Sequence, residues 1–366
     1  MSEYILIVIW IGFMAVLADA KDFCRTEIVC GQRVKRYVLW FSIVVFLPII
    51  WMAGHRGDWV GDTGMYVMSF RGMPTSLTDF FKYVDTVEKD KGFYAFSAII
   101  KLIIGNNRIL YFTIIAAIQG GAILAIFRKY SISYMVSVFL FVISTDYIGW
   151  MHNGMRQFLA VAIVFAATPL ILKKKYVPLL LVILLASTMH RSALIMIPIV
   201  FIAQGKAWNR KTLTFIVLTL LAITFVGEFT EVLDSSLAET QYANVVTDYK
   251  EWQDDGTNPL RVLVCSVPTI LALIGWKSIR KLNDPLVDLY TNMSIISTGL
   301  YIISMFTSGI FMGRLPIYAS LYGYLLLPWE IEHLFTPKSR KVVYLCLVGC
   351  YALYYYYQMH MVYGLF

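Results

Sequence analysis

The sequence predicts an all-α membrane protein that crosses the bilayer many times, and three observations support this fold class. Hydrophobic residues make up 59% of the 366 residues, charged residues only 15%, and the mean hydropathy is +0.68. Soluble domains carry about 25% charged residues, so the composition excludes an ordinary water-soluble protein. A bilayer-spanning helix needs about 20 mostly apolar residues, and the chain has room for about 12 such helices.

The predicted transmembrane helices coincide with apolar runs that end at charged residues, glycine or proline. A further run, 93–104, is too short for a span and predicts an interfacial or re-entrant helix. The first run has no basic segment before it, which indicates a retained helix and not a cleaved signal peptide. The runs expected to span are 4–18, 37–53, 109–127, 131–147, 156–172, 176–189, 193–204, 212–229, 260–276, 286–307, 315–330 and 342–359.

The basic residues predict the side of the bilayer that each loop faces. Lysine and arginine in short loops favour the cytoplasmic side, and 19 of the 31 lie in alternate short loops. We therefore expect both termini outside. These loops also explain the net charge of +8, so the expected partner is the lipid bilayer and not nucleic acid. The cytoplasmic loops are 19–36, 128–130, 173–175, 205–211, 277–281 and 331–341.

Two long loops fall on the outer side of what we expect to be a single membrane domain, residues 1–366. In the first, 54–108, Ser76 and Asp79 form a capping box before apolar residues at helical spacing, which predicts an amphipathic helix on the outer leaflet. The second, 230–259, combines carboxylates with aromatic residues such as Trp252. Carboxylates beside aromatic rings suit a binding site for a sugar, although a solvated loop with ordinary surface aromatics explains the composition equally well.

Four arginines lie at predicted outer ends of helices: Arg156, Arg191, Arg261 and Arg314. Charges at membrane depth cost about 2.5–3.5 kcal/mol and normally face a cavity or a partner. The arginines therefore predict a shared basic cavity for a lipid phosphate or diphosphate, because the planar guanidinium binds phosphate with two hydrogen bonds. The alternative is that each arginine only anchors the end of its helix at the interface.

Two residues are candidates for a general base. His190 lies beside Arg191, whose positive charge favours the neutral, proton-accepting imidazole. Asp62 lies in a glycine-rich polar turn, where it could accept a proton or simply cap that turn. For His190 the alternative is an interfacial hydrogen-bonding role. The sequence has no His-X-X-X-His or Cys-X-X-Cys pattern, so we expect no metal and no cofactor.

Three short motifs occur between apolar helices and together resemble a known family. They are Arg56 with Gly61-Asp62-Thr63 and Tyr66, then Gly154-Met155-Arg156-Gln157, then His190-Arg191-Ser192-Ala193. This combination resembles the EpsG family of polysaccharide polymerases, relatives of the Wzy O-antigen and capsule polymerases. The similarity covers about residues 40–205 and, more weakly, the region from Arg314 to the end.

The resemblance implies a GT-C-like polymerase architecture and a metal-independent glycosyltransferase on the periplasmic or outer face of the bacterial inner membrane. Such an enzyme joins oligosaccharide units carried on undecaprenyl diphosphate into O-antigen, capsule or exopolysaccharide, with a Wzz-like chain-length regulator and a flippase as partners. His190 or Asp62 would take the proton of the acceptor. The diphosphate would be bound by Arg56, Arg156, Arg191, Arg261 and Arg314, and the glycan by Thr63, Tyr66, Gln157, Ser192 and Trp252.

Two other functions fit the composition: a flippase for lipid-linked oligosaccharides, and a ligase that transfers glycan to another acceptor. Transporters place polar or ionisable groups near the bilayer midplane. Here the centres of the apolar runs are nearly free of charge, and Gln119 is one of their few strongly polar residues. Charge gathered at one face favours a one-sided enzyme over a transporter, but the sequence does not separate a ligase from a polymerase.

Overall fold

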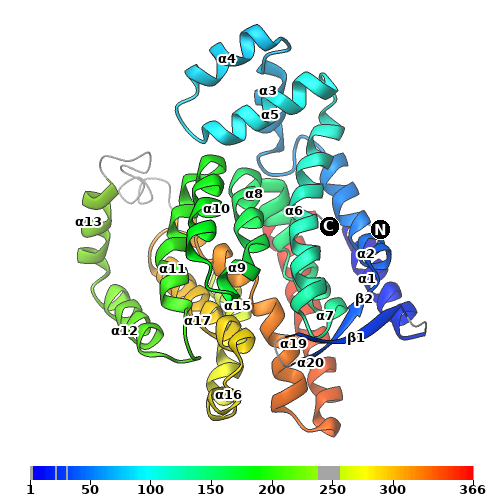
Figure 1. Ribbon diagram of the computed structural model, residues 1–366, viewed down its shortest axis with the longest axis vertical. Helices are drawn as coiled ribbons and strands as arrows, with labels where there is room; N and C mark the ends of the chain where they lie inside the picture. The colour runs from blue at the N-terminus through cyan, green and yellow to red at the C-terminus, as the bar shows by residue number, and fades with distance from the viewer. Residues whose placement is uncertain (1–2, 21–22, 30–31, 238–255, 366) are drawn as a thin grey trace. The chain divides into compact units, whose positions relative to one another are not determined.

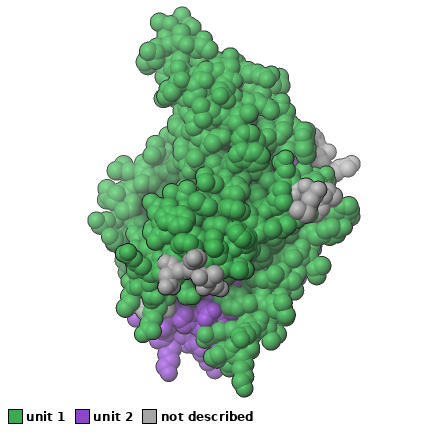
Figure 2. All heavy atoms as spheres, turned by 90° about the vertical axis from the view of Figure 1, so that its right-hand side faces the viewer, with its two compact units in different colours: residues 1–194, 336–366 green, residues 195–335 purple. Residues whose placement is uncertain are grey.

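The computed structural model describes residues 3–20, 23–29, 32–237 and 256–365, which are helical almost throughout (Figure 1). They divide into two compact units, coloured in Figure 2. Unit 1 comprises Met1–Leu194 and Thr336–Phe366, and unit 2 comprises Ile195–Phe335. The prediction of a mainly α-helical membrane protein is confirmed.

Unit 1 is organised around α6 (Arg108–Tyr130), which packs against α2 and α8 along its length. The side chain of Asn107 begins this helix by accepting a hydrogen bond from the Leu110 N–H, which satisfies one of the free donors of the first turn. The other elements of unit 1 are α1 (Glu3–Ala20), β1 (Cys24–Val29), β2 (Gln32–Tyr37), α2 (Leu39–His55), α3 (Thr63–Gly72), α4 (Leu77–Thr86), α5 (Lys91–Ile104), α7 (Tyr134–Ile143), η1 (Tyr147–Asn153), α8 (Met155–Ala166), α9 (Thr168–Leu172), α10 (Tyr176–Met189), η2 (Arg191–Ile195), α20 (Pro337–Tyr357) and η4 (Gln358–Val362).

The two ends of α6 carry different structures. The short helices α3, α4 and α5 gather beyond its first residues, and the β1–β2 hairpin lies near its last turn (Figure 1). There Arg128 donates a hydrogen bond from Nε to the carbonyl of Tyr37 at 2.6 Å. The basic hairpin and the three short helices are therefore at opposite ends of this helix.

The β1–β2 hairpin is a feature of the predicted loop 19–36 that the sequence analysis did not predict. The strands are antiparallel, with Cys24 opposite Tyr37 and Val29 opposite Gln32. The segment alternates β-branched and polar residues, a pattern that favours a strand once a partner strand is present, and Arg36 forms an ion pair with Glu27 at 2.5 Å.

The helix start predicted at Ser76 in the first long loop is confirmed. Ser76 is the N-cap of α4, and its hydroxyl oxygen accepts a hydrogen bond from the Asp79 N–H at 3.2 Å. The run 93–104 forms α5, a single helix that contacts α3, α4 and α6. That these helices lie on the outer leaflet stays a prediction.

Unit 2 is organised around α17 (Pro285–Phe306), which packs against α12 and α15. Two polar residues of α17 fix the turn before α12: Asp288 accepts a hydrogen bond from the Ala207 N–H at 2.7 Å, and Asn292 accepts one from the Trp208 N–H at 3.2 Å. The other elements are α11 (Met196–Ala203), α12 (Arg210–Thr224), α13 (Val226–Leu237), α15 (Pro259–Ile274), α16 (Trp276–Leu282), η3 (Met312–Arg314), α18 (Ile317–Ser320) and α19 (Gly323–Leu334).

Several expected spans are broken helices. Within the described residues, α6 and α17 alone are long and apolar enough to cross a membrane unbroken, and counting each sharply bent pair as one span gives up to five. The run 131–147 bends by 69° between α7 and η1, where Thr145 adopts a φ of +66°. The runs 212–229 and 260–276 bend by 104° and 72°. The structure offers no physical reason for the 104° bend, and the count of about 12 spans stays a prediction.

Unit 2 contains two buried carboxyl groups at or near the ends of predicted apolar runs. Glu330 of α19 is fully buried, and neither carboxylate oxygen has a hydrogen-bond partner among the described residues. Asp288 is buried as well, although it bonds to the Ala207 N–H. Glu330 ends the run 315–330 and Asp288 is the third residue of the run 286–307, so the centres of these runs are free of both charges.

Candidate functional site

Arg56 joins the helices at the base of the candidate site. It directly follows α2, is only 4% exposed, and lies over the Phe112 ring of α6 with its Cζ 3.9 Å from the ring centroid. Its Nε donates to Thr63 Oγ1 at 3.0 Å, and Nη2 donates to the Met155 sulfur at 3.4 Å. Burial lowers the pKa of Arg56 to about 10. Arg56 is therefore still a cation at neutral pH, and it links α2, α3, α6 and α8.

The turn before α3 is fixed by Asn153, which ends η1. Asn153 Oδ1 accepts a hydrogen bond from the Asp62 N–H at 3.0 Å, and its carbonyl accepts one from the Tyr66 hydroxyl at 3.4 Å. Gly61 has a φ of +52°, and a Cβ at this position would lie 2.7 Å from Asn153 Oδ1. The Asp62 carboxylate makes no capping bond to α3 within the described chain. Both roles considered for Asp62, proton acceptor and cap of its own turn, stay predictions.

Arg156, in the first turn of α8, lies at the centre of the next group. Its Nη1 donates to Asp90 Oδ2 at 2.9 Å and to the Tyr94 hydroxyl at 3.4 Å, and it also hydrogen-bonds Tyr66. The Arg156 side chain is 31% exposed, whereas that of Asp90 is 4% exposed. We call Arg156, Asp90, Tyr94 and Tyr66 the Arg156 cluster. It holds a guanidinium in a fixed orientation while leaving part of it accessible.

Asp90 was not predicted. It precedes α5 with a φ of +52°. Burial raises the pKa of its carboxyl, while Arg156, the backbone N–H of Arg191 and Lys89 stabilise the carboxylate and oppose this rise. Its position depends on the close approach of α5 to α10, because a Cβ on Gly92 would collide with Thr188. The only signal in the sequence is an acidic residue between two lysines, which is ordinary in a surface loop.

His190, Arg191 and Ser192 lie where α10 ends. Nδ1 of the His190 ring and the Ser192 hydroxyl share a hydrogen bond of 2.7 Å. The Arg191 side chain is exposed, and its backbone contacts Asp90. A continuous series of contacts therefore connects this segment through Asp90 and Arg156 to the turn at Asp62. Gln157 is buried in α8 beside the cluster.

A second residue missed as a site candidate is His152, one residue before Asn153. Its side chain is fully buried, and neither ring nitrogen has a hydrogen-bond partner among the described residues. His152 and Asn153 line a cavity of about 130 Å³ together with Trp59, Gly61 and Tyr363. A buried imidazole without hydrogen-bond partners is unusual. The cavity beside the candidate site therefore has unsatisfied polar atoms in its wall.

Arg261 and Arg314 belong to unit 2, where the structure brings their loops together. Arg261 lies in the first turn of α15, and Arg314 ends η3. Thr257 links the loops: its N–H donates to the Ser304 carbonyl at 3.0 Å, and a Cβ on Gly313 would lie 2.5 Å from its hydroxyl. Because these arginines and the Arg156 cluster belong to different units, a cavity shared by all of them stays a prediction. Trp252 lies outside the described residues.

Comparison with known proteins gives one match. The model of the EpsG family matches residues 39–365, which is nearly the whole chain and includes all three motifs. No curated protein and no solved structure matches this sequence. The extent of the family match and the apolar helices lead to one conclusion: the chain belongs to the EpsG family, membrane proteins of the polysaccharide-polymerase type.

Proposed function

We propose that this protein polymerises oligosaccharide repeat units carried on undecaprenyl diphosphate. The observation that carries the proposal is the Arg156 cluster, in which a partly exposed guanidinium is oriented by a buried carboxylate and two tyrosine hydroxyls. A fixed, accessible arginine suits a diphosphate, because it binds phosphate oxygens in a planar fork without having to reorganise.

In the proposed reaction, a hydroxyl at the non-reducing end of the acceptor unit attacks the anomeric carbon of the growing chain. A new C–O bond forms, the bond from that carbon to the diphosphate oxygen breaks, and undecaprenyl diphosphate leaves with the bonding electrons. Arg156 and Arg191 bind the leaving diphosphate, whose negative charge rises in the transition state. Arg261 and Arg314 are proposed to extend the diphosphate site, and Tyr66, Gln157 and Ser192 to contact glycan.

Arg56 and Thr63 have a different role in this proposal. The guanidinium of Arg56 bonds to Thr63, Met155 and the Ala53 carbonyl, and it is almost completely buried. It therefore acts as a positioning residue that holds the start of α3 against α8. Thr63 Oγ1 in turn donates to the Val60 carbonyl at 2.5 Å, which closes the turn that carries Asp62.

We place the reaction on the extracytoplasmic face of the plasma membrane. The Arg156 cluster includes residues from the start of α5, and the short helices α3–α5 lie at the opposite end of α6 from the basic β1–β2 hairpin. If the hairpin is cytoplasmic, as the five lysines and arginines of the loop 19–36 favour, the cluster is on the outer side. A cysteine at position 58 should then react with a membrane-impermeant maleimide added to intact cells. Labelling only after lysis would contradict this orientation.

The proton acceptor is tested by His190→Gln and Asp62→Asn, each assayed for polymer length and rate across a range of pH. Loss of a general base typically lowers a rate by about 100- to 10,000-fold. We expect one of the two variants to show a loss of this size together with a changed pH profile. If both variants keep the parent rate and pH profile, neither residue is the base, and His152 becomes the next candidate because its ring lies buried beside Asn153.

Gly61→Ala tests whether the Asp62 turn must hold its geometry. The added Cβ would displace Asn153 Oδ1 and break its bond to the Asp62 N–H. We expect polymer synthesis to fall by at least about tenfold, since small misplacements of a positioned group reduce rates strongly. Gly105→Ala is the matched control: Gly105 also has a positive φ, +65°, but a Cβ there meets no atom within 4 Å. Equal losses in both variants would show that backbone strain, and not the turn, is responsible.

Glu330 supports a second candidate function, transport of the lipid-linked oligosaccharide. A fully buried carboxyl group without partners among the described residues is typical of ion and proton pathways in transporters. Under this alternative Glu330→Gln abolishes the delivery of repeat units to the outer face. Under the polymerase proposal single units still accumulate there and only their joining depends on Arg156.

A further inference from the structure

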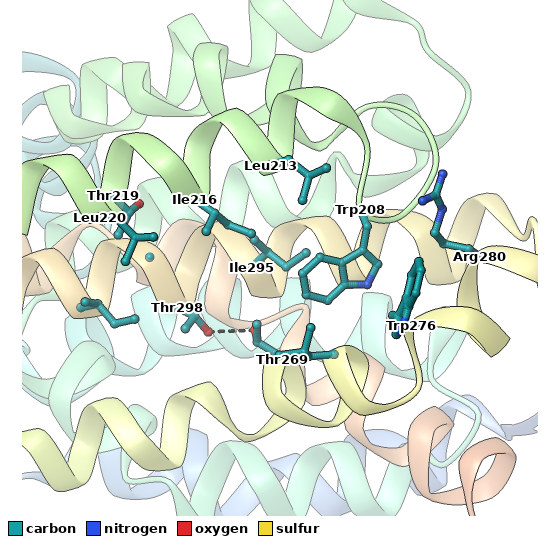
Figure 3. A pocket seen from close by; sticks show the side chains of 13 residues that line it. Trp208, Leu213, Ile216, Thr219, Leu220, Thr269, Trp276, Arg280, Ile295 and Thr298 are labelled. Carbon is teal, nitrogen blue, oxygen red and sulfur yellow. Dashed lines mark hydrogen bonds between the residues drawn. The ribbon is translucent and has the colours of Figure 1, made fainter.

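Unit 2 contains an apolar slot that the proposed reaction does not use (Figure 3). Helices α12 and α15 both pack against α17, and the slot lies between them with a volume of about 540 Å³. Its walls are aliphatic, with Leu213 and Leu220 from α12, Leu273 from α15, and Ile295 from α17. This volume falls within the range of about 300–1,000 Å³ that is usual for small-molecule sites.

One end of the slot is polar and positively charged. Trp208, Trp276 and Arg280 lie together there, as Figure 3 shows. Lys277 lies on α16 together with Trp276 and Arg280, and its Nζ is 6.0 Å from the centroid of the Trp276 ring. Tryptophan beside lysine and arginine at the end of an apolar helix is the usual composition of a membrane–water interface.

The indole N–H of Trp208 needs an acceptor. Trp208 is 9% exposed, and its Nε1 has no hydrogen-bond partner among the described residues. A buried tryptophan N–H normally has a partner. By contrast, Thr269 and Thr298 deeper in the slot satisfy each other through a hydrogen bond of 2.8 Å. Thr219, at the opposite end of the slot in Figure 3, also has a hydroxyl without a hydrogen-bond partner among the described residues. At the Trp208 end, the unsatisfied donor lies beside a cation, Arg280.

We propose that this slot binds one acyl chain of an anionic phospholipid, with its phosphate at Arg280 and the Trp208 N–H. A water molecule occupies about 30 Å³ in the liquid and a methylene group is of similar size, so the slot holds on the order of 18 such groups, the size of one acyl chain. An undecaprenyl chain is far larger. Arg280 also lies in the loop 277–281, predicted to be cytoplasmic, so the occupant comes from the inner leaflet, where basic pockets bind anionic headgroups.

Phospholipid binding at this slot is independent of the polymerase reaction, and it is measured without glycan. The full chain is purified in detergent, stripped of lipid, and titrated with phosphatidylglycerol or with phosphatidylcholine of the same acyl chains. We expect phosphatidylglycerol to bind at least about tenfold more tightly, because both lipids present a phosphate to Arg280, but the trimethylammonium of phosphatidylcholine brings a like charge beside Arg280 and Lys277. Equal affinity for the two lipids would overturn the proposal.

Three variants test the site itself. Trp208→Phe removes the N–H but keeps an aromatic ring, and Arg280→Gln removes the charge; each should weaken phosphatidylglycerol binding by about tenfold. Lys281→Gln is the matched control, because Lys281 is the neighbouring cation of α16 but does not line the slot. A loss with Lys281→Gln as large as with Arg280→Gln would show general surface charge instead of a site.

Competitors identify the occupant. Inorganic phosphate should not displace phosphatidylglycerol at millimolar concentration, since most of the contact is with the chain. Displacement by inorganic phosphate would show that the site binds only the headgroup, and it would contradict binding of an acyl chain. Displacement by undecaprenyl phosphate at concentrations comparable to phosphatidylglycerol would assign the slot to the glycan carrier and contradict the phospholipid proposal.

Discussion

Arg156→Ala should reduce polymer synthesis by about 100- to 1,000-fold, the loss expected when a preorganised donor to developing negative charge is removed. Arg156 is the cation of its cluster, is partly exposed, and is held by Asp90, Tyr94 and Tyr66. Arg156→Lys keeps the charge but loses the planar fork, and should retain activity between that of the parent and that of the alanine variant. The measurement is the length distribution of lipid-linked glycan from cells that lack the native copy.

A loss of activity could also arise from misfolding, because Arg156→Ala leaves the Asp90 carboxylate buried without its cation. Breaking a buried ion pair by removing one partner typically destabilises by about 3–5 kcal/mol. The double variant Asp90→Asn with Arg156→Ala removes both charges, so it should regain much of the stability while staying inactive. Arg71→Ala is the control, because Arg71 is an exposed arginine at the end of α3. Normal polymer lengths from the double variant would show that Arg156 is not part of the diphosphate site.

Arg56→Ala should have the largest effect on folding. The substitution leaves a cavity beside Phe112 and removes the donors to Thr63 and to the Ala53 carbonyl. Together these losses should lower the free energy of unfolding by about 3–5 kcal/mol. The midpoint of thermal unfolding of the purified protein in detergent should fall by on the order of 10 °C.

Arg56→Lys separates the charge of this residue from its hydrogen bonds. Lysine keeps the cation over Phe112 but cannot donate to Thr63, Met155 and Ala53 together, so we expect an intermediate loss of stability. If Arg56→Ala has an unchanged unfolding midpoint and normal polymer synthesis, Arg56 neither stabilises the packing of these helices nor contributes to the reaction.

The sequence predicted the helical class and several local features because these depend on neighbouring residues. The Ser76 cap follows from a spacing of three residues, and α6 and α17 follow from long apolar runs. The bend at Thr145 was not predictable from an apolar run, because a positive φ at a threonine leaves no trace in hydropathy. The β1–β2 hairpin was missed for a similar reason, since its basic residues dominated the pattern.

The candidate site was predictable where its residues lie in short motifs. Arg156 and Gln157 follow a glycine at the start of a helix, and Arg191 follows His190 between two helices. Asp90 could not be found in this way, because it is 66 residues from Arg156 and depends on the packing of α5 against α10. The same holds for Trp208, whose unsatisfied N–H appears only once α12, α15 and α17 are packed.

The most direct test of the account uses purified protein and lipid-linked repeat units extracted from cells of its own host that lack the native copy. The parent protein should convert single units into a ladder of lengths and release one undecaprenyl diphosphate for each glycosidic bond formed, and Arg156→Ala should give neither product. Diphosphate release without lengthening would contradict polymerisation. A full ladder from Arg156→Ala would contradict the assignment of the Arg156 cluster as the site where the diphosphate is bound.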